Sequence, residues 1–170
     1  NEGASVALNF NNSSKDAEQT AEEINSKGGV AKVFKADITK YNEVLKMVQS
    51  IKKDLGSIDF LINNAGYTKI QRFVESNAND WDKQIDTSLK GAINCCHAVA
   101  PDMIEKHFGK IINLVGDSSR IGEANLSATA AARGGTIALG KSLAKEFGRS
   151  NITVNTVSSV SYTHLTLPTT

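Results

Sequence analysis

The chain has 170 residues, of which 40% are hydrophobic and 22% charged, a balance typical of one globular domain with its own core. Its net charge is +1 with both signs interspersed, so no basic stripe predicts nucleic-acid binding, and no apolar run approaches the roughly 20 residues that span a membrane. No charged-then-apolar leader opens the sequence, which favours a cytoplasmic protein.

Short strand-like runs alternate with longer helical ones. In chain order we expect a strand at 4–10, a helix at 13–29, a strand at 30–37, a helix at 40–56, a strand at 58–62, a helix at 79–107, a strand at 110–115, a helix at 126–148 and a strand at 152–157. This regular alternation predicts an α/β fold, a doubly wound parallel sheet of the Rossmann type.

Local signals place the ends of the helices. Ser13 can cap the first helix and Asn79 the third, and Pro101 is expected to kink the third. The apolar face of the second helix is predicted from 3- and 4-residue spacing, and it comprises Val44, Leu45, Val48, Ile51 and Leu55.

Both ends of the chain depart from a complete nucleotide-binding domain. Such a fold needs an earlier strand and a glycine-rich turn leading into a helix, and no GxGxxG or GxxxGxG occurs in the sequence. We therefore expect residues 1–158 to be a partial dinucleotide-binding domain that lacks its first strand, its glycine-rich loop and its C-terminal strand.

The segment 159–170 is interpreted as a non-native tail. Its residues from 160 onward, VSYTHLTLPTT, are threonine-rich and match the conceptual translation of a transposase sequencing adapter. The alternative is a genuine irregular tail. We exclude this segment, with its Tyr162 and His164, from the search for functional residues.

The adjacent cysteines, Cys95 and Cys96, have neither CxxC spacing nor a ligand cluster around them. They are predicted to be buried, reduced thiols. No metal site is expected.

Several motifs lie at the ends of the predicted strands. LINNAG (61–66) ends a buried strand in residues that let a nucleotide approach the backbone, although NNAG alone is compatible with a plain turn. The other motifs are KADIT (35–39), GKIINLVG (109–116), ARGGTIALGKSLAKEF (132–147) and NITVNTVS (151–158). Together they resemble the short-chain dehydrogenase/reductase family, particularly its 3-oxoacyl-carrier-protein-reductase-like members, over residues 1–158.

The resemblance implies an NAD(P)-dependent oxidoreductase that transfers a hydride between a nicotinamide cofactor and a small carbonyl or alcohol. It implies that Asp37 binds the adenine amino group with Ile38 beside the ring, and that Asn63, Ala65 and Gly66 line the ribose and the approach to the nicotinamide. A helix cap is the alternative role for Asp37, and the two roles are compatible.

In the family, a member that prefers NAD usually places an acid at the end of the strand that is 4–10 here, where it holds the 2′-hydroxyl group of the ribose. Here the sequence is Asn9-Phe10-Asn11-Asn12, with Lys15 further on. Because no acid repels a 2′-phosphate, NADP is favoured over NAD.

The family's catalytic positions are all substituted. Its proton-donating tyrosine and its lysine correspond to Thr129 and Arg133, its orienting serine to Gly116 and its asparagine to Ser88. No register shift restores the tyrosine, since no tyrosine lies between Tyr67 and Tyr162.

These substitutions remove ordinary acid–base chemistry. An aliphatic hydroxyl is far too weak an acid to replace a phenol, and Arg133 keeps its charge, so it can bind ribose hydroxyls but cannot relay a proton. Ser118 and Ser119 are candidate substitutes for the serine, and Asp117 for the acid, although capping roles are the simpler interpretation of all three.

Two hypotheses follow. The protein is an oxidoreductase with an altered acid, or it is a catalytically impaired homologue that binds cofactor or acts as an oligomer scaffold. The resemblance implies a homo-oligomer, dimer or tetramer, paired through the helices 79–107 and 126–148. Simple packing of those helices on the sheet is the alternative.

Overall fold

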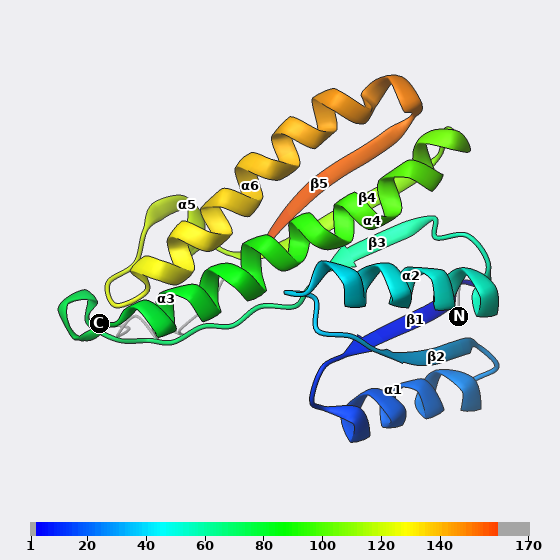
Figure 1. Cartoon of the computed structure of the whole chain (residues 1–170), viewed down its shortest axis with the longest axis horizontal. Coiled ribbons are helices and arrows are strands. Elements are labelled where there is room, and N and C mark those ends of the chain that lie inside the picture. The colour runs from blue at the N-terminus through cyan, green and yellow to red at the C-terminus, as the bar shows by residue number, and fades with distance from the viewer. Residues whose placement is uncertain (1–2, 160–170) are drawn as a thin grey trace, which may run out of the picture.

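The computed structural model of the chain describes residues 3–159, and these confirm the predicted α/β alternation (Figure 1). The strands are β1 (Ser5–Phe10), β2 (Val30–Lys35), β3 (Phe60–Asn63), β4 (Gly109–Gly116) and β5 (Ile152–Ser159). The helices are α1 (Ser14–Ser26), α2 (Tyr41–Leu55), α3 (Ala78–Ile85), α4 (Gly91–Glu105), α5 (Ser118–Ile121) and α6 (Ser127–Phe147). β5 ends at Ser159, the first residue of the predicted tail, and the rest of that segment lies outside the described residues.

All strand pairs are parallel, but they form two separate ladders. Within residues 3–159, β1 pairs only with β2, and β3 pairs with β4, which pairs with β5. The interruption falls between β1 and β3. Both facing edges therefore leave backbone N–H and C=O groups without a ladder partner among the described strands.

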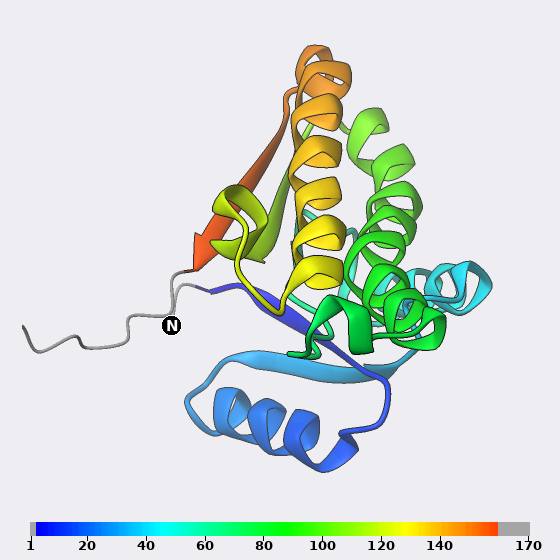
Figure 2. The same cartoon turned by 90° about the vertical axis from the view of Figure 1, so that its left-hand side faces the viewer.

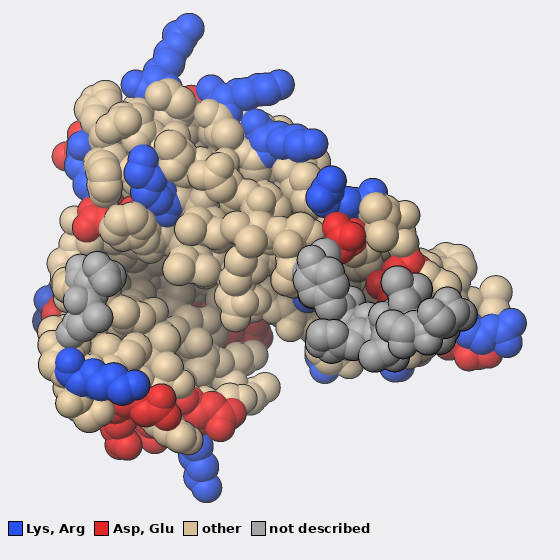
Figure 3. All heavy atoms as spheres, turned by 180° about the vertical axis from the view of Figure 1, so that it is seen from behind, with Lys and Arg blue, Asp and Glu red and all other residues tan. Residues whose placement is uncertain are grey.

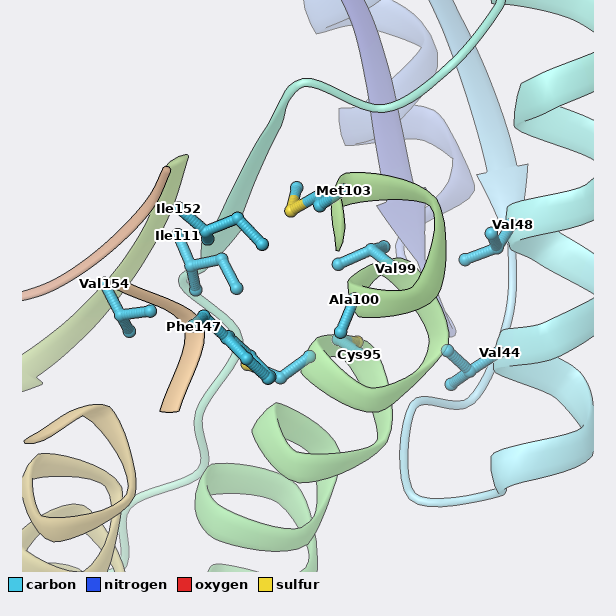
Figure 4. Close-up of a cluster of buried hydrophobic side chains, with 11 residues drawn as sticks. Val44, Val48, Cys95, Val99, Ala100, Met103, Ile111, Phe147, Ile152 and Val154 are labelled. Carbon is cyan, nitrogen blue, oxygen red and sulfur yellow. The ribbon is translucent and has the colours of Figure 1, made fainter. Parts of the chain in front are cut away.

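One face of the three-stranded ladder carries the core. Helices α2, α4 and α6 lie on this side, while α1 lies on the other side of the β1–β2 pair (Figure 2). This division is what right-handed crossovers between parallel strands require. The core side chains come from α2, α4, α6, β4 and β5, and comprise Val44, Val48, Cys95, Cys96, Val99, Ala100, Met103, Ile111, Phe147, Ile152 and Val154 (Figure 4).

The opposite face of the same ladder is uncovered by any described helix. The register sets Ile62 beside Ile112 and Leu114 beside Val157, so their side chains share this face. Phe60 and Ile62 are 60% and 59% exposed. Seen from behind, the middle of the molecule carries few charged side chains (Figure 3).

The predicted helix 79–107 is confirmed as a helical segment, but its start and its middle differ from the prediction. Its N-cap is Asn77, whose side chain accepts a hydrogen bond from the backbone N–H of Asp80, rather than Asn79. The helix also passes from α3 to α4 through a wide, π-helical turn over Asp86–Lys90, and Pro101 lies inside α4. No local signal predicts this turn, because Asp86–Lys90 contains no glycine or proline.

Two smaller predictions have different outcomes. Ser13 occupies the N-cap of α1, but its side chain makes no capping hydrogen bond. The predicted face of α2 is confirmed, with Val44, Val48 and Ile51 buried.

The cysteines are free and buried, as predicted. Burial is the main cause that raises the pKa of Cys95 to about 12 and that of Cys96 to about 11. Both thiols therefore stay protonated near neutral pH and are unsuited to nucleophilic or metal-binding roles. Among residues 3–159 there is no cluster of metal-ligating side chains, and no helix is long and apolar enough to cross a bilayer.

The interrupted ladder and the uncovered apolar face predict that the 170-residue polypeptide, made alone, is unstable or aggregates. Apolar side chains such as Phe60 and Ile62 contribute less to folding than buried ones, because more than half of each stays exposed to water. Thermal unfolding followed by circular dichroism, with sedimentation to define the assembly, tests this expectation. A soluble monomer with a cooperative melt would contradict it.

Candidate active site

Residues from distant parts of the sequence meet at the carboxyl ends of β3 and β4. Gly66 follows β3, Gly116 ends β4, Ser88 lies in the wide turn between α3 and α4, and Arg133 lies in α6. The side chains of Ser88 and Arg133 both approach Gly66, and that of Arg133 also approaches Gly116. In open α/β sheets this edge is where ligands bind.

The Arg133 guanidinium lies between the two glycines. Its Nη1 is 2.9 Å from the point where a Cβ at Gly116 would stand, and its Nη2 is 3.1 Å from the corresponding point at Gly66. The first distance is shorter than a real Cβ contact, so a side chain at residue 116 would force the end of the Arg133 side chain to shift. The second is only a tight contact, and a side chain at residue 66 would displace the guanidinium by a few tenths of an ångström. The substitutions at the predicted serine and lysine positions are thus sterically linked.

Thr129, at the predicted tyrosine position, is enclosed. It is 1% exposed, and its hydroxyl donates to Oε1 of Gln84 in α3. Gln84 is itself buried, and its Nε2 donates to the carbonyl of Asp80 at 2.9 Å. The hydroxyl therefore joins α6 to α3 and is not directed at the carboxyl ends of β3 and β4.

Ser88, at the predicted asparagine position, is also buried. Its Oγ lies 3.5 Å from the Cβ position of Gly66 and accepts from the backbone N–H of Tyr67 at 3.4 Å. Its carbonyl accepts from Thr136 Oγ1 at 3.0 Å. Ser88 thus fixes the start of the loop after β3 against α6.

A polar cluster holds the rest of that loop. The Asp80 carboxylate accepts from Lys69 at 2.7 Å and from Gln71 at 3.1 Å, as well as from Asn77. The hydrogen bond from Lys69 is the largest cause of the lowered pKa of Asp80, followed by that from Gln71. Sequence analysis missed this cluster and Gln84, because single polar residues in a loop and on an amphipathic helix have no distinctive spacing.

The candidate substitutes for the catalytic groups make local contacts. Ser119 Oγ donates to the carbonyl of Gly116, and Ser118 is buried with its Oγ 3.6 Å from the Cβ position of Gly116. Asp117 lies 3.8 Å from Arg120 in an ion pair and accepts from Ser158 at 3.5 Å. These contacts fit the turn roles that the sequence allows for all three.

The predicted adenine side lies beyond β2. The Asp37 carboxylate accepts from the Thr39 hydroxyl at 2.7 Å and from the Thr39 N–H at 3.0 Å. The hydrogen bond from the Thr39 side chain is the main cause that lowers the pKa of Asp37. Asp37 therefore closes a turn before α2 and does not cap the helix itself. Ile38 packs on Gly91, where an added Cβ would lie 2.5 Å from the Ile38 Cδ1.

The NNAG segment divides into a fixed part and an open part. Asn63 Nδ2 donates to Asn113 Oδ1 at 2.9 Å and to Cys96 Sγ at 3.4 Å, so this amide ties β3 to β4 and α4. Ala65 and Gly66 are exposed. Their small size leaves the backbone after β3 accessible to a ligand.

Comparison with known proteins agrees with this arrangement. The family model described as short chain dehydrogenase matches residues 1–164. The chain belongs to the short-chain dehydrogenase family. The sequence-based recognition of the family and of the Rossmann-type fold is therefore confirmed.

Two reductases are among the relatives that the chain resembles in sequence. The chain is 41% identical over 159 residues to a 3-oxoacyl-[acyl-carrier-protein] reductase of Staphylococcus epidermidis, covering 92% of this chain and 64% of the relative. It is 34% identical over 143 residues to an acetoacetyl-CoA reductase of Shinella zoogloeoides, covering 82% of this chain and 58% of the relative. The chain thus spans less than two thirds of the length of these relatives.

Solved structures give the same result. An NAD⁺-bound xylitol dehydrogenase is 30% identical with a TM-score of 0.90, over 94% of this chain and 61% of that one. A gluconate 5-dehydrogenase from Burkholderia cenocepacia, in complex with NADP and tartrate, is 27% identical with a TM-score of 0.87, over 93% of this chain and 62% of that one.

If the Thr129 hydroxyl is a structural tie, Thr129→Val in the protein that contains this chain lowers the free energy of unfolding by about 1–3 kcal/mol, because Gln84 Oε1 loses its hydroxyl donor in a buried site. Thr20→Val on the exposed face of α1 is the matched control, with an expected change within about 0.5 kcal/mol. Chemical denaturation measures both. Equal effects of the two substitutions contradict the structural role.

Proposed function

We propose that the protein containing this chain is an NAD(P)-dependent oxidoreductase that acts on a small carbonyl or alcohol substrate. The observation that carries the proposal is the site at the carboxyl ends of β3 and β4. There, exposed small residues and a guanidinium converge in a chain whose family assignment covers nearly its whole length. No nucleic acid or membrane is part of the proposed function.

The residues of this site fit a nicotinamide cofactor on its adenosine and nicotinamide sides. Asp37 and Ile38 would hold the adenine, Asn63, Ala65 and Gly66 would line the ribose, and Arg133 would donate to ribose hydroxyls. When bound, the cofactor supplies or accepts the hydride. Nothing in residues 1–170 supplies the glycine-rich turn for its pyrophosphate.

NADP is proposed in preference to NAD. No acid follows β1, and Asn9 at that point donates to the carbonyls of Phe34 and Ala36 at 3.2 and 3.1 Å. The end of β1 therefore carries no carboxylate to repel a 2′-phosphate.

Proton transfer at the substrate oxygen is the step that this chain supports least. Thr129 is buried and bonded to Gln84, and Arg133 cannot release a proton. Asp117 is the remaining acid next to the site, and its contacts with Arg120 and Ser158 favour a structural role. Loss of a general acid lowers a rate by about 10²–10⁴-fold.

The enclosure of Thr129 favours a second candidate function, a catalytically impaired homologue that binds cofactor without turnover. We further propose that the protein is a homo-oligomer, dimer or tetramer, paired through α4 and α6. Partly exposed apolar residues on α4, such as Ile93 and Ile104, support this interface.

NADPH fluorescence titration, combined with an assay of carbonyl reduction, separates the two functions. For an oxidoreductase with an altered acid we expect NADPH binding and measurable turnover in the unaltered protein. Thr129→Tyr alone should not increase the rate of carbonyl reduction, because the tyrosine would have to displace Gln84 from a buried position. Binding without turnover selects the impaired homologue, and absence of NADPH binding overturns the proposed cofactor site.

A further inference from the structure

Among the residues that the structure describes, no counter-charge faces the guanidinium of Arg133. Within residues 3–159 no carboxylate lies in ion-pair range of it and no acceptor is in hydrogen-bond contact with it, although the residue is half-buried. Asp117, the acid that directly follows β4, pairs with Arg120 instead. A partly buried cation without a partner is costly, so this position is well suited to an anion from outside the chain.

The absence of a side chain at Gly116 determines where the guanidinium lies. A serine at residue 116 would begin at the Cβ position that now lies 2.9 Å from Arg133 Nη1. The guanidinium thus lies in the region from which a serine hydroxyl at residue 116 would contact a ligand. The permanently charged donor of Arg133 takes the place of that neutral hydroxyl donor.

We propose that Arg133, admitted by Gly116 and Gly66, forms a binding site for a small carboxylate at the carboxyl ends of β3 and β4. The planar guanidinium has five donors, and its fork matches the two oxygens of a carboxylate better than the single oxygen of a ketone or alcohol. One edge can therefore bind a carboxylate while another contacts a ribose. Ser88 Oγ, 3.5 Å from the Cβ position of Gly66, is the nearest additional polar group.

This inference deepens the proposed function, since it makes the ligand beside the cofactor an acid. It does not require hydride transfer, so it is tested by binding alone. The probes are malonate and its uncharged amide, malonamide, titrated calorimetrically into the protein that contains this chain, with and without NADPH. We expect malonate to bind at least about tenfold more tightly than malonamide, because charge-assisted hydrogen bonds are roughly twice as strong as neutral ones.

Variants locate the site. Arg133→Gln and Gly116→Ser should each abolish the preference for malonate, the first by removing the charge and the second by moving the guanidinium. Gly134→Ala is the matched control beside Arg133. Its Cβ would meet the Ser119 carbonyl oxygen at 3.5 Å, an ordinary contact, so malonate binding should persist.

Each result of these titrations either supports or overturns the proposed carboxylate site. Malonate bound selectively and lost in both site variants supports the proposal. Equal binding of the two probes, no binding of malonate, or malonate binding unchanged by Gly116→Ser overturns it. If NADPH fails to bind while selective malonate binding remains, the proposed cofactor site is wrong but the carboxylate site stands.

Discussion

The chemistry of the site depends on a steric condition, namely that residues 66 and 116 have no side chains. Arg133 Nη1 and Nη2 lie 2.9 and 3.1 Å from the Cβ positions of Gly116 and Gly66, so the guanidinium keeps this position only while residue 116 is glycine, and a side chain at residue 66 would press on it. At the positions that the sequence resemblance assigns to the family's serine and lysine, this chain has Gly116 and Arg133. The missing side chain at residue 116 leaves room for the guanidinium of Arg133.

A second constraint acts on the same helix. Four residues before Arg133, the hydroxyl of Thr129 is buried against Gln84, and Gln84 is fixed through the backbone of α3. The face of α6 that would present a proton donor instead joins α6 to α3. The site thus retains positive charge and lacks an acid directed at a ligand, which is why binding is better supported than turnover.

Much of the fold follows from sequence patterns, because parallel strands buried on one or both faces and amphipathic helices have distinct periodicities. The face of α2 with Val44 and Val48 was predictable for this reason. The π-helical turn between α3 and α4 was not predictable, since helical spacing continues through Asp86–Lys90 and the hydrogen bond from Thr136 to the Ser88 carbonyl joins residues far apart in sequence.

The candidate active site was predictable from sequence to about the same extent as the fold. The resemblance singled out Gly116, Ser88 and Arg133, and these residues do meet at one edge of the sheet. Sequence alone could not indicate that the Asn63 side chain bonds Asn113, that Asp37 bonds Thr39 instead of capping the helix, or that Gln84 encloses Thr129. Such contacts join residues far apart in sequence and leave no local pattern.

The most direct test of this account is a crystal structure of the protein that contains this chain, determined with NADPH bound. The account predicts that the Arg133 guanidinium lies against Gly66 and Gly116 and that the Thr129 hydroxyl points to Gln84, away from the nicotinamide. A guanidinium turned out to solvent, or a Thr129 hydroxyl facing the nicotinamide, would contradict it.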